Sequence, residues 1–431
     1  MDFLRIFAQG LADLLREPPI LMGIVALVGL IAQRKAANQV VSGTVKTIAG
    51  FMIMATGAGM VAGVVRPISA MIEGIIGLEV TAPGMGTDAF LAEFGGTVTM
   101  IMAFGFLVNV FLARVTPFKF IFLTGHQIFW MSFVYVAMTV EVIPDVGTTT
   151  LLIFGSLLLG LYLTLAPAAA QPFMRKVTGN DDIAYGHTTT VGVIAGSLIG
   201  RLFATDKEKT SEDIKVPEKL DFLKDITVST TIVMVALYLL GVALTGSSYV
   251  MENLSGGEAA FLYAIKQGFA FGIGLTILLM GVSMMIAEIV PAFKGISEKI
   301  VPNAKPALDC PVVFNFAPTA VMLGFLSCLS TVLLCMVGFG AAGWYALTPP
   351  VITTFFGGGP AGVFGNSTGG WKGAIAAGIL AGLLMSFGQA LTVPLLSTTV
   401  ADFARWSNDF DYSVLTPIYH FILSIFETIF N

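Results

Sequence analysis

The chain has 431 residues, of which 56% are hydrophobic and only 11% are charged. Soluble domains carry about 25% charged residues, so this composition excludes an ordinary soluble enzyme and predicts an integral membrane protein. The formal net charge is −5, and no basic patch points to a nucleic-acid partner. We therefore expect an all-α polytopic membrane protein with about ten or eleven transmembrane helices of ordinary length.

Residues 1–200 read as a first transmembrane half. Its first segment, 1–17, is short and amphipathic and lacks the pattern of a cleaved signal peptide. Broken or re-entrant elements are predicted at the Gly-, Pro- and Thr-rich stretch 78–96, and at 180–200, whose apolar run is too short to cross a bilayer. The expected spans are 18–33, 43–65, 97–113, 118–140 and 149–170.

Residues 201–226 form the one extended polar loop of the sequence. Its many lysines are matched by acidic residues, so the positive-inside rule favours a cytoplasmic face only weakly. We interpret this loop as a solvated cytoplasmic connector between two halves. A docking role for a soluble partner remains an open alternative.

Residues 227–431 read as a second transmembrane half with two further broken elements, near 288–318 and 344–370. The stretch Met284–Phe325 is rich in proline, which predicts that no continuous helix passes through it. Polar groups at membrane depth are tolerated where they face protein or a wet cavity, so this segment is expected to line a cavity. The expected spans are 228–245, 259–286, 317–339, 373–395 and 417–430.

A faint internal repeat links the two halves. Three residues of the first half recur at identical spacing in the second: Gly57, Met60 and Pro67 against Gly281, Met284 and Pro291. Two related halves that each end in discontinuous membrane elements are typical of transporters built from structural repeats, with the substrate near the bilayer midplane.

Few ionisable residues are predicted inside the bilayer: His126, His187, Glu288 and Asp309, with Glu73 and Asp88 nearer an interface. Each could be purely structural, satisfied by backbone or a neighbour. The two histidines each follow a glycine at the mouth of a broken element and have hydroxyl neighbours, which favours a binding role. A carboxylate, two imidazoles and nearby hydroxyl and amide groups suit a neutral or weakly acidic polyhydroxy ligand.

Signatures of soluble enzymes are missing from the sequence. It has no Walker A loop, no HExxH and no GxSxG. The three cysteines, Cys310, Cys328 and Cys335, lack metal-ligand spacing and are interpreted as packing residues. No cofactor and no metal are expected.

Seven motifs occur in order over nearly the whole chain: 43–52 (GTVKTIAGFM), 123–126 (LTGH), 186–187 (GH), 292–297 (AFKGIS), 309–310 (DC), 316–325 (FAPTAVMLGF) and 362–371 (GVFGNSTGGW). Together they resemble the ascorbate-type membrane IIC component of the phosphotransferase system, within the ascorbate/galactitol superfamily. This resemblance implies a homodimer with a substrate-holding core domain, a scaffold (V-motif) domain that mediates dimerisation, and elevator-type movement of the core. It also implies phosphorylation of the substrate by a separate IIB protein that carries a phosphocysteine.

The resemblance also assigns residues. His126, His187 and Asp309 match binding-site positions of the family, and Asp309 could accept the proton of a hydroxyl that is about to be phosphorylated. Where glutamines are expected in ascorbate members, this chain has Ala55, Trp130-Met131 and Thr188-Thr189-Thr190. The candidate substrate contacts are His126, His187, Thr188, Thr87, Thr56, Gly57, Asp309 and Asn315.

The sequence thus predicts a multi-pass permease of the bacterial inner membrane that binds an ascorbate-like or polyol substrate, with L-ascorbate as the best guess. Its partners would be soluble IIB and IIA proteins, because no phosphoryl donor is recognised on this chain. One alternative is a proton- or sodium-coupled secondary transporter of a small polyhydroxy or carboxylate solute on the same scaffold. Another is a membrane sensor that binds the sugar without moving it.

Overall fold

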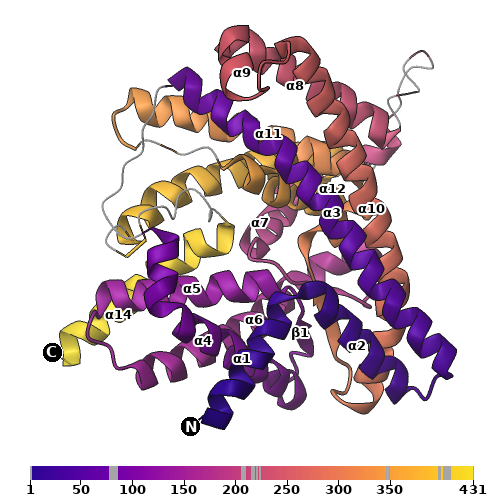
Figure 1. Cartoon of the computed structure of the whole chain (residues 1–431), viewed down its shortest axis with the longest axis vertical. Coiled ribbons are helices and arrows are strands. Elements are labelled where there is room, and N and C mark those ends of the chain that lie inside the picture. Colours follow the sequence, from indigo (N-terminus) through magenta and orange to yellow (C-terminus); the bar gives the residue numbers. More distant parts are fainter. Residues whose placement is uncertain are drawn as a thin grey trace.

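The computed structural model describes residues 2–76, 86–204, 210–214, 219, 222, 225–345, 347, 350–396, 399–400 and 409–430. Helices form almost all of it, as Figure 1 shows. The first-half helices are α1 (Asp2–Arg16), α2 (Pro18–Ala32), α3 (Ala37–Ile76), α4 (Thr87–Val115), α5 (Gly125–Val142), α6 (Thr148–Thr178) and α7 (Thr190–Gly200). The second-half helices are α8 (Ile226–Thr245), α9 (Ser247–Asn253), α10 (Ala260–Lys299), α11 (Pro318–Ala341), α12 (Val351–Thr392) and α14 (Phe410–Phe430). Short 3-10 turns occur at η1 (Arg201–Phe203), η2 (Ser211–Asp213), η4 (Cys310–Phe316) and η5 (Val393–Leu396).

Seven helices in the described part of the chain are long and apolar enough to cross a membrane: α3, α4, α6, α8, α10, α11 and α12. This confirms the predicted all-helical polytopic class. The shorter apolar helices α2 and α7 fall below that length, so a count of ten or eleven spans stays a prediction.

Several predicted boundaries are wrong, and in two cases the reason is a proline that does not end its helix. α10 continues through Pro291 to Lys299, and α12 is helical through Pro360. A proline removes a single backbone donor, and a helix packed along most of its length tolerates that loss. The predicted loop 78–96 is helical from Thr87 onward, while 77–85 lie outside the described residues. The predicted span 118–140 is a strand followed by a helix that begins only at Gly125.

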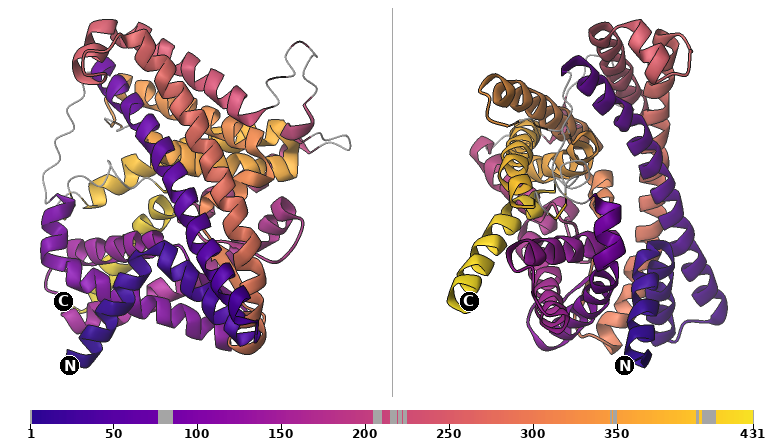
Figure 2. Two further views of the ribbon diagram at one scale, coloured as in Figure 1. Left: turned by 45° about the vertical axis from the view of Figure 1, so that its right-hand side comes forward. Right: turned by 60° about the vertical axis from the view of Figure 1, so that its left-hand side comes forward.

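The helices pack as two groups, each drawing on both halves of the chain. We call α2, α3, α8 and α10 the scaffold group, and α4, α5, α6, α7, α11, α12 and α14 the core group. The right-hand view of Figure 2 shows the long helices of the scaffold group standing beside the core group. The candidate site lies where the two groups meet.

The scaffold group is centred on the crossing of α3 and α10, where glycines allow the backbones to touch. A Cβ added to Gly57 would lie 2.3 Å from the Leu278 nitrogen and 2.6 Å from the Gly274 oxygen. A Cβ added to Gly281 would lie 2.1 Å from the Met54 nitrogen. Small residues at such contacts are how helices associate closely in lipid, so this crossing is a fixed joint.

The core group contains a small parallel sheet that the sequence did not predict. Its strands are β1 (Phe120–Phe122), β2 (Ala184–Tyr185) and β3 (Lys305–Leu308), in the order β1-β3-β2. Buried sheet edges need hydrogen-bond partners. Asn109 of α4 supplies them for β1, donating to the Phe120 oxygen at 3.0 Å and accepting from the Phe122 nitrogen at 3.0 Å.

α12 is interrupted near its middle. Gly369 and Gly370 leave the helical conformation, and Gly370 has φ 59°, which favours glycine. The two arms close on one another, because a Cβ on Gly365 would lie 2.4 Å from the Gly373 oxygen. α12 is thus a helical hairpin whose glycine faces pack together.

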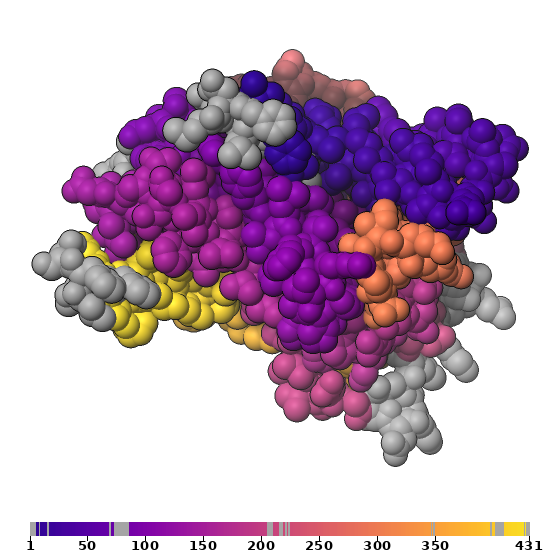
Figure 3. Space-filling view, turned by 90° about the horizontal axis from the view of Figure 1, so that it is seen from below, coloured from indigo at the N-terminus to yellow at the C-terminus, as the bar shows by residue number. Residues whose placement is uncertain are grey.

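One end of the molecule is basic. The carboxyl end of α10 reaches the surface beside the α2–α3 corner and the segment after α4, as Figure 3 shows from below in orange, indigo and purple. Arg114 donates to the Ile300 oxygen at 2.7 Å and so joins α4 to the end of α10. The basic residues of this end include Arg34, Lys35, Arg114, Lys119, Lys294 and Lys299, with one acid, Glu298, among them.

Candidate functional site

The sheet delivers three predicted site residues to one place. His126 follows β1 by four residues, His187 follows β2 by two, and Asp309 follows β3 directly. The carboxyl ends of parallel strands meet at one edge, which is where ligands bind in sheets of this kind. Gly186 must be glycine, since a Cβ there would lie 2.6 Å from the Ala307 oxygen of β3.

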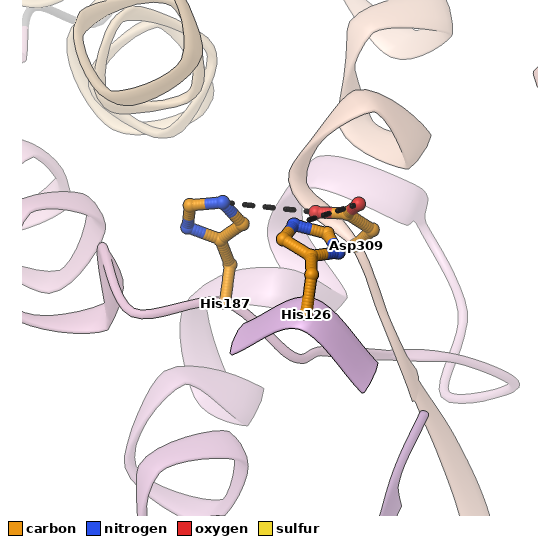
Figure 4. Close-up of side chains that lie close together, drawn as sticks. All are labelled: His126, His187 and Asp309. Carbon is orange, nitrogen blue, oxygen red and sulfur yellow. Dashed lines mark ion pairs between the residues drawn. The ribbon is translucent and has the colours of Figure 1, made fainter. Parts of the chain in front are cut away.

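The three side chains face one another, as Figure 4 shows. The Asp309 carboxylate lies 3.7 Å from His126 Nε2 through Oδ2 and 3.7 Å from His187 Nε2 through Oδ1. The imidazole of His126 is 46% exposed, whereas that of His187 is 4% exposed. Asp309 also accepts from the Cys310 nitrogen at 2.7 Å, which fixes it as the cap of η4.

A buried hydrogen-bond network holds His187. Its Nδ1 lies 3.0 Å from the hydroxyl of Thr189, which in turn lies 2.6 Å from the Tyr185 hydroxyl. Its Nε2 lies 2.8 Å from the side-chain amide of Gln127. Thr188 donates to the same amide at 2.6 Å. The ring of His187 is therefore held on both sides, whereas the ring of His126 pairs with Asp309 and is half-exposed.

A cavity of about 430 Å³ opens in front of this cluster, and its two walls differ. The core group supplies every polar lining residue, together with apolar ones such as Trp130 and Phe356. The scaffold group supplies an apolar wall from the start of α2 and the middle of α3. The polar lining residues are His126, Gln127, His187, Thr353, Asp309, Asp409 and Tyr412, and the scaffold residues are Pro18, Pro19, Phe51, Met54, Ala55 and Ala58.

A second cavity, of about 980 Å³, lies on the other side of His126, between α1, α4, α5 and α6. Its polar lining includes Gln9, Asp13, Glu93 and Thr97. His126 lines both cavities, which accounts for its exposure and makes it the boundary between them.

Five predicted contacts are absent from the cavity lining: Thr188 is buried directly behind it, and four others lie away from the cluster. Thr56 is exposed and donates to the Met52 oxygen of its own helix, and Gly57 packs against α10. Asn315 donates to Ser283 and to the Leu279 oxygen, both on α10. Thr87 lies in the first turn of α4. The structure therefore brings His126, His187, Asp309 and Thr188 together and leaves these four elsewhere.

Sequence reasoning missed four polar lining residues: Gln127, Thr353, Asp409 and Tyr412. Asp409 accepts a short hydrogen bond from Thr188, and Tyr412 donates to the Gln127 carbonyl oxygen at 3.2 Å. An available signal for Asp409 was a pair of acids, Asp409 and Asp411, directly before an apolar helix. Carboxylates at that position are expensive in a membrane unless they have partners.

Glu288, the remaining predicted intramembrane acid, pairs with Lys46 at 3.1 Å and so braces α10 against α3. It lies in the scaffold group rather than at the cavity.

The cluster could in principle bind a metal, since one ligand atom from each of His126, His187 and Asp309 lies within 4.8 Å of the others. That spacing is loose, because metal–ligand bonds of about 2.0–2.2 Å bring the donor atoms closer together. His187 Nε2 is also occupied by Gln127. The arrangement suits hydroxyl groups better than an ion.

An ion-pair group supports the far end of the sheet. Asp181, which precedes β2, contacts Arg175 at 2.7 Å and pairs with Lys305 at the start of β3. Partial burial works to raise the pKa of Asp181, but hydrogen bonds from Arg175, Lys305 and Gln171 outweigh it and hold that pKa well below its ordinary value. The carboxylate therefore stays ionised and ties β2 to β3.

Residues 13–411 match the model of a family described as the sugar-specific permease component of the phosphotransferase system. The chain belongs to this family. It is also 28% identical over 444 residues to the ascorbate-specific phosphotransferase-system EIIC component of Mycoplasma pneumoniae. That alignment covers 91% of this chain and 66% of the relative, so the chain spans just under two-thirds of the relative's length. Together with the apolar helices, membership of this family makes the chain a multi-pass protein of the inner membrane.

Proposed function

We propose that this permease binds a small polyhydroxy compound, L-ascorbate or a polyol, in the cavity between the core and scaffold groups. The convergence of His126, His187 and Asp309 on that cavity carries the proposal. A volume of about 430 Å³ falls in the range of small-molecule sites, roughly 300–1,000 Å³. Imidazole nitrogens, a carboxylate and an amide supply the hydrogen bonds that several neighbouring hydroxyls require.

In this proposal Asp309 is the catalytic residue. Its carboxylate would accept the proton of a substrate hydroxyl while a separate IIB protein transfers a phosphoryl group from its phosphocysteine to that oxygen. The cysteine–phosphorus bond breaks, the oxygen–phosphorus bond forms, and the proton goes to Asp309. His126, at the edge of the cavity, would orient the substrate, and the fixed ring of His187 would position Asp309.

The movement we propose is that of an elevator, with the core group sliding against a fixed scaffold group. The division of the cavity supports this, because the polar contacts to a ligand come from the core group and the scaffold offers an apolar wall. A bound solute can then travel with the core without breaking hydrogen bonds to the scaffold. Homodimer formation through the scaffold group belongs to the same proposal.

The two transmembrane halves, 1–200 and 227–431, would be structural repeats, with the broken stretches of each half serving as its re-entrant elements. The α3–α10 crossing supports the repeat, because Gly57 and Gly281 occupy equivalent repeat positions, and so do Gly50 and Gly274. Gly50 contacts Gly281, and Gly57 contacts Gly274. An approximate two-fold axis exchanges these two contacts, as expected for related halves.

The basic end of the molecule would face the cytoplasm, following the positive-inside rule. The connector 201–226 would lie at that face as well, which would leave the substrate to enter from the periplasmic side. IIB and IIA would then meet the core group from the cytoplasm.

Transport by the purified chain in proteoliposomes tests this function. We expect labelled substrate to accumulate as its phosphate ester only when IIB, IIA and a phosphoryl donor are present inside. Accumulation against a gradient without these proteins would contradict the proposal and support an ion-coupled transporter. Binding without any change in cysteine accessibility across the membrane would instead support a sensor.

A further inference from the structure

The last helix of the chain completes the candidate site. α14 begins at Phe410, and the residues around its start contact α5 and α7 rather than lipid alone. Asp411 accepts from the Val191 nitrogen at 2.7 Å and from the Tyr162 hydroxyl at 2.6 Å, so it caps α7. Asp409 and Tyr412 line the cavity itself.

Asp409 lies at the end of a hydrogen-bond chain that runs through Thr188 and Gln127 to His187. Its carboxylate determines which group donates and which accepts at each step. Thr188 has one hydroxyl hydrogen but lies within hydrogen-bond distance of both the Asp409 carboxylate and the Gln127 amide. An ionised carboxylate only accepts. When Thr188 donates to Asp409, Gln127 must therefore turn its NH₂ toward Thr188 and its carbonyl toward His187. The Tyr412 hydroxyl, 3.2 Å from the same side of the amide, then accepts from that NH₂ instead of donating to the carbonyl.

That orientation has a consequence for His187. Facing a carbonyl, Nε2 must carry the ring hydrogen, and Nδ1 then accepts from Thr189, which accepts from Tyr185. Every group in this buried chain is satisfied. Asp409 is thus tied to the imidazole beside Asp309 through two intervening side chains.

Asp409 also changes the charge of the cavity. The described lining residues include two carboxylates, Asp309 and Asp409, and no lysine or arginine. The two imidazoles that could become cations are His126 and His187, and both already face Asp309. A monoanionic ligand would meet two negative charges without a dedicated partner, whereas neutral hydroxyls can donate to both carboxylates.

We propose that Asp409 is a specificity-determining residue that selects an uncharged polyol over a monoanion such as ascorbate. It does so by adding a second carboxylate to the cavity wall and, through Thr188 and Gln127, by fixing the tautomer of His187. This inference rests on the proposed function and narrows its substrate class.

The test measures dissociation constants of the full chain in nanodiscs at pH 7 and fixed ionic strength. The ligands are L-ascorbate and a panel of pentitols and hexitols. We expect the wild type to bind its best polyol at least about tenfold more tightly than ascorbate. Asp409→Asn should reduce that ratio about tenfold, because about 1.4 kcal/mol of repulsion corresponds to a factor of ten. Asp409→Glu should keep it.

Two matched variants separate charge from structure. Asp145→Asn removes one negative charge at an exposed loop and should leave the ratio unchanged. Thr188→Val removes the hydrogen bonds that join Asp409 to Gln127 but keeps both carboxylates of the cavity. Polyol binding should therefore become weaker, while ascorbate should still bind less tightly than the polyol.

Nitrogen NMR of histidine-labelled protein gives an independent readout, since the chain has only three histidines. The His187 resonances should report a hydrogen on Nε2 in the wild type and a changed or mixed tautomer in Asp409→Asn. A wild type that prefers ascorbate, or an Asp409→Asn variant with both the ratio and the tautomer unchanged, would overturn the inference. Binding of neither ligand class by the wild type would remove the proposed function itself.

Discussion

The scaffold and core groups solve the problem of burying a chain in lipid in opposite ways. In the scaffold group, α3 and α10 are each 40 residues long, continue through a proline, and touch backbone to backbone at glycines. In the core group, the chain leaves the helix at three strands, and the buried side chain of Asn109 completes the hydrogen bonds of the β1 edge. The first arrangement packs backbones closely and places only apolar side chains at the cavity, whereas the second exposes polar groups to it.

The difference explains why the polar side chains of the candidate site come from one group. Where a helix is interrupted, its free backbone N–H and C=O groups need hydrogen bonds from neighbouring polar groups. Polar binding residues are therefore tolerated at the same places. The scaffold contributes shape alone to the cavity, through side chains such as Phe51 and Met54. Variants in the core should therefore change function, and variants in the scaffold should change assembly.

The sharpest test of this division is Asp309→Asn. We expect transport-coupled phosphorylation to fall at least about 100-fold, since removing a general base typically loses a factor of 10²–10⁴. The fold should survive, because the asparagine side-chain oxygen can still cap η4 at the Cys310 nitrogen. Uptake in proteoliposomes and thermal unfolding of the same preparation are the two measurements. Near-normal uptake by this variant would remove Asp309 from the mechanism.

The converse test is Gly57→Leu at the scaffold crossing. No side chain fits there, since even a Cβ would lie 2.3 Å from the Leu278 nitrogen. We expect a loss of several kcal/mol, beyond the roughly 1–3 kcal/mol of ordinary overpacking, and little folded protein. Gly59→Leu is the matched control, because open space surrounds that position. Equal yields of the two variants in detergent would show that the crossing is not a fixed joint.

These two groups also differ in how far the sequence predicts them. Apolar length and glycine content were enough to predict long packed helices around Gly57 and Gly281, although the prolines of the stretch after Met284, Pro291 among them, were given too much weight as breaks. The parallel sheet escaped prediction because its strands have only two to four residues and join segments far apart in the chain. Hydropathy alone cannot distinguish Phe120–Phe122 from the start of a spanning helix.

The candidate site was predictable where its residues are ionisable side chains within apolar segments, since such residues are rare in membrane helices. His126, His187 and Asp309 are ionisable groups in apolar surroundings, and the structure brings them together. Gln127 and Tyr412 do not stand out in this way, so only the fold reveals that they line the cavity. Thr56 and Asn315 look like substrate contacts by composition, yet they satisfy helix carbonyls and neighbours.

Asn109→Leu probes how the core tolerates its broken backbone. The change removes the Asn109 amide, which is the hydrogen-bond partner of the Phe120 oxygen and of the Phe122 nitrogen at the β1 edge. Both backbone groups then stay buried without that partner. We expect a destabilisation of about 2–6 kcal/mol, at about 1–3 kcal/mol for each of the two unsatisfied groups, with weaker substrate binding because β1 positions His126. Thermal unfolding and ligand titration measure the two effects. Asn253→Leu, at an exposed asparagine that bonds only its own helix, is the control. An Asn109 variant as stable as that control would mean that the β1 edge needs no side-chain partner.

The smallest effect is expected at Asp181→Asn, which loosens the far end of the sheet without touching the cavity. The carboxylate is 45% exposed, so screening limits its two ion pairs to about 1 kcal/mol or less. Because the folded pKa of Asp181 lies below its ordinary value of 3.8, this contribution is complete at pH values above about 4 and is lost as the pH falls further. Unfolding at pH 7 and pH 5 should show the same small gap between wild type and variant, and the gap should close in stronger acid. A difference in unfolding free energy that already changes between pH 7 and pH 5 would assign the effect to another titratable group. A difference of several kcal/mol would mean that the stability of the sheet depends on this one cluster of ion pairs, as that of the scaffold group depends on the α3–α10 crossing.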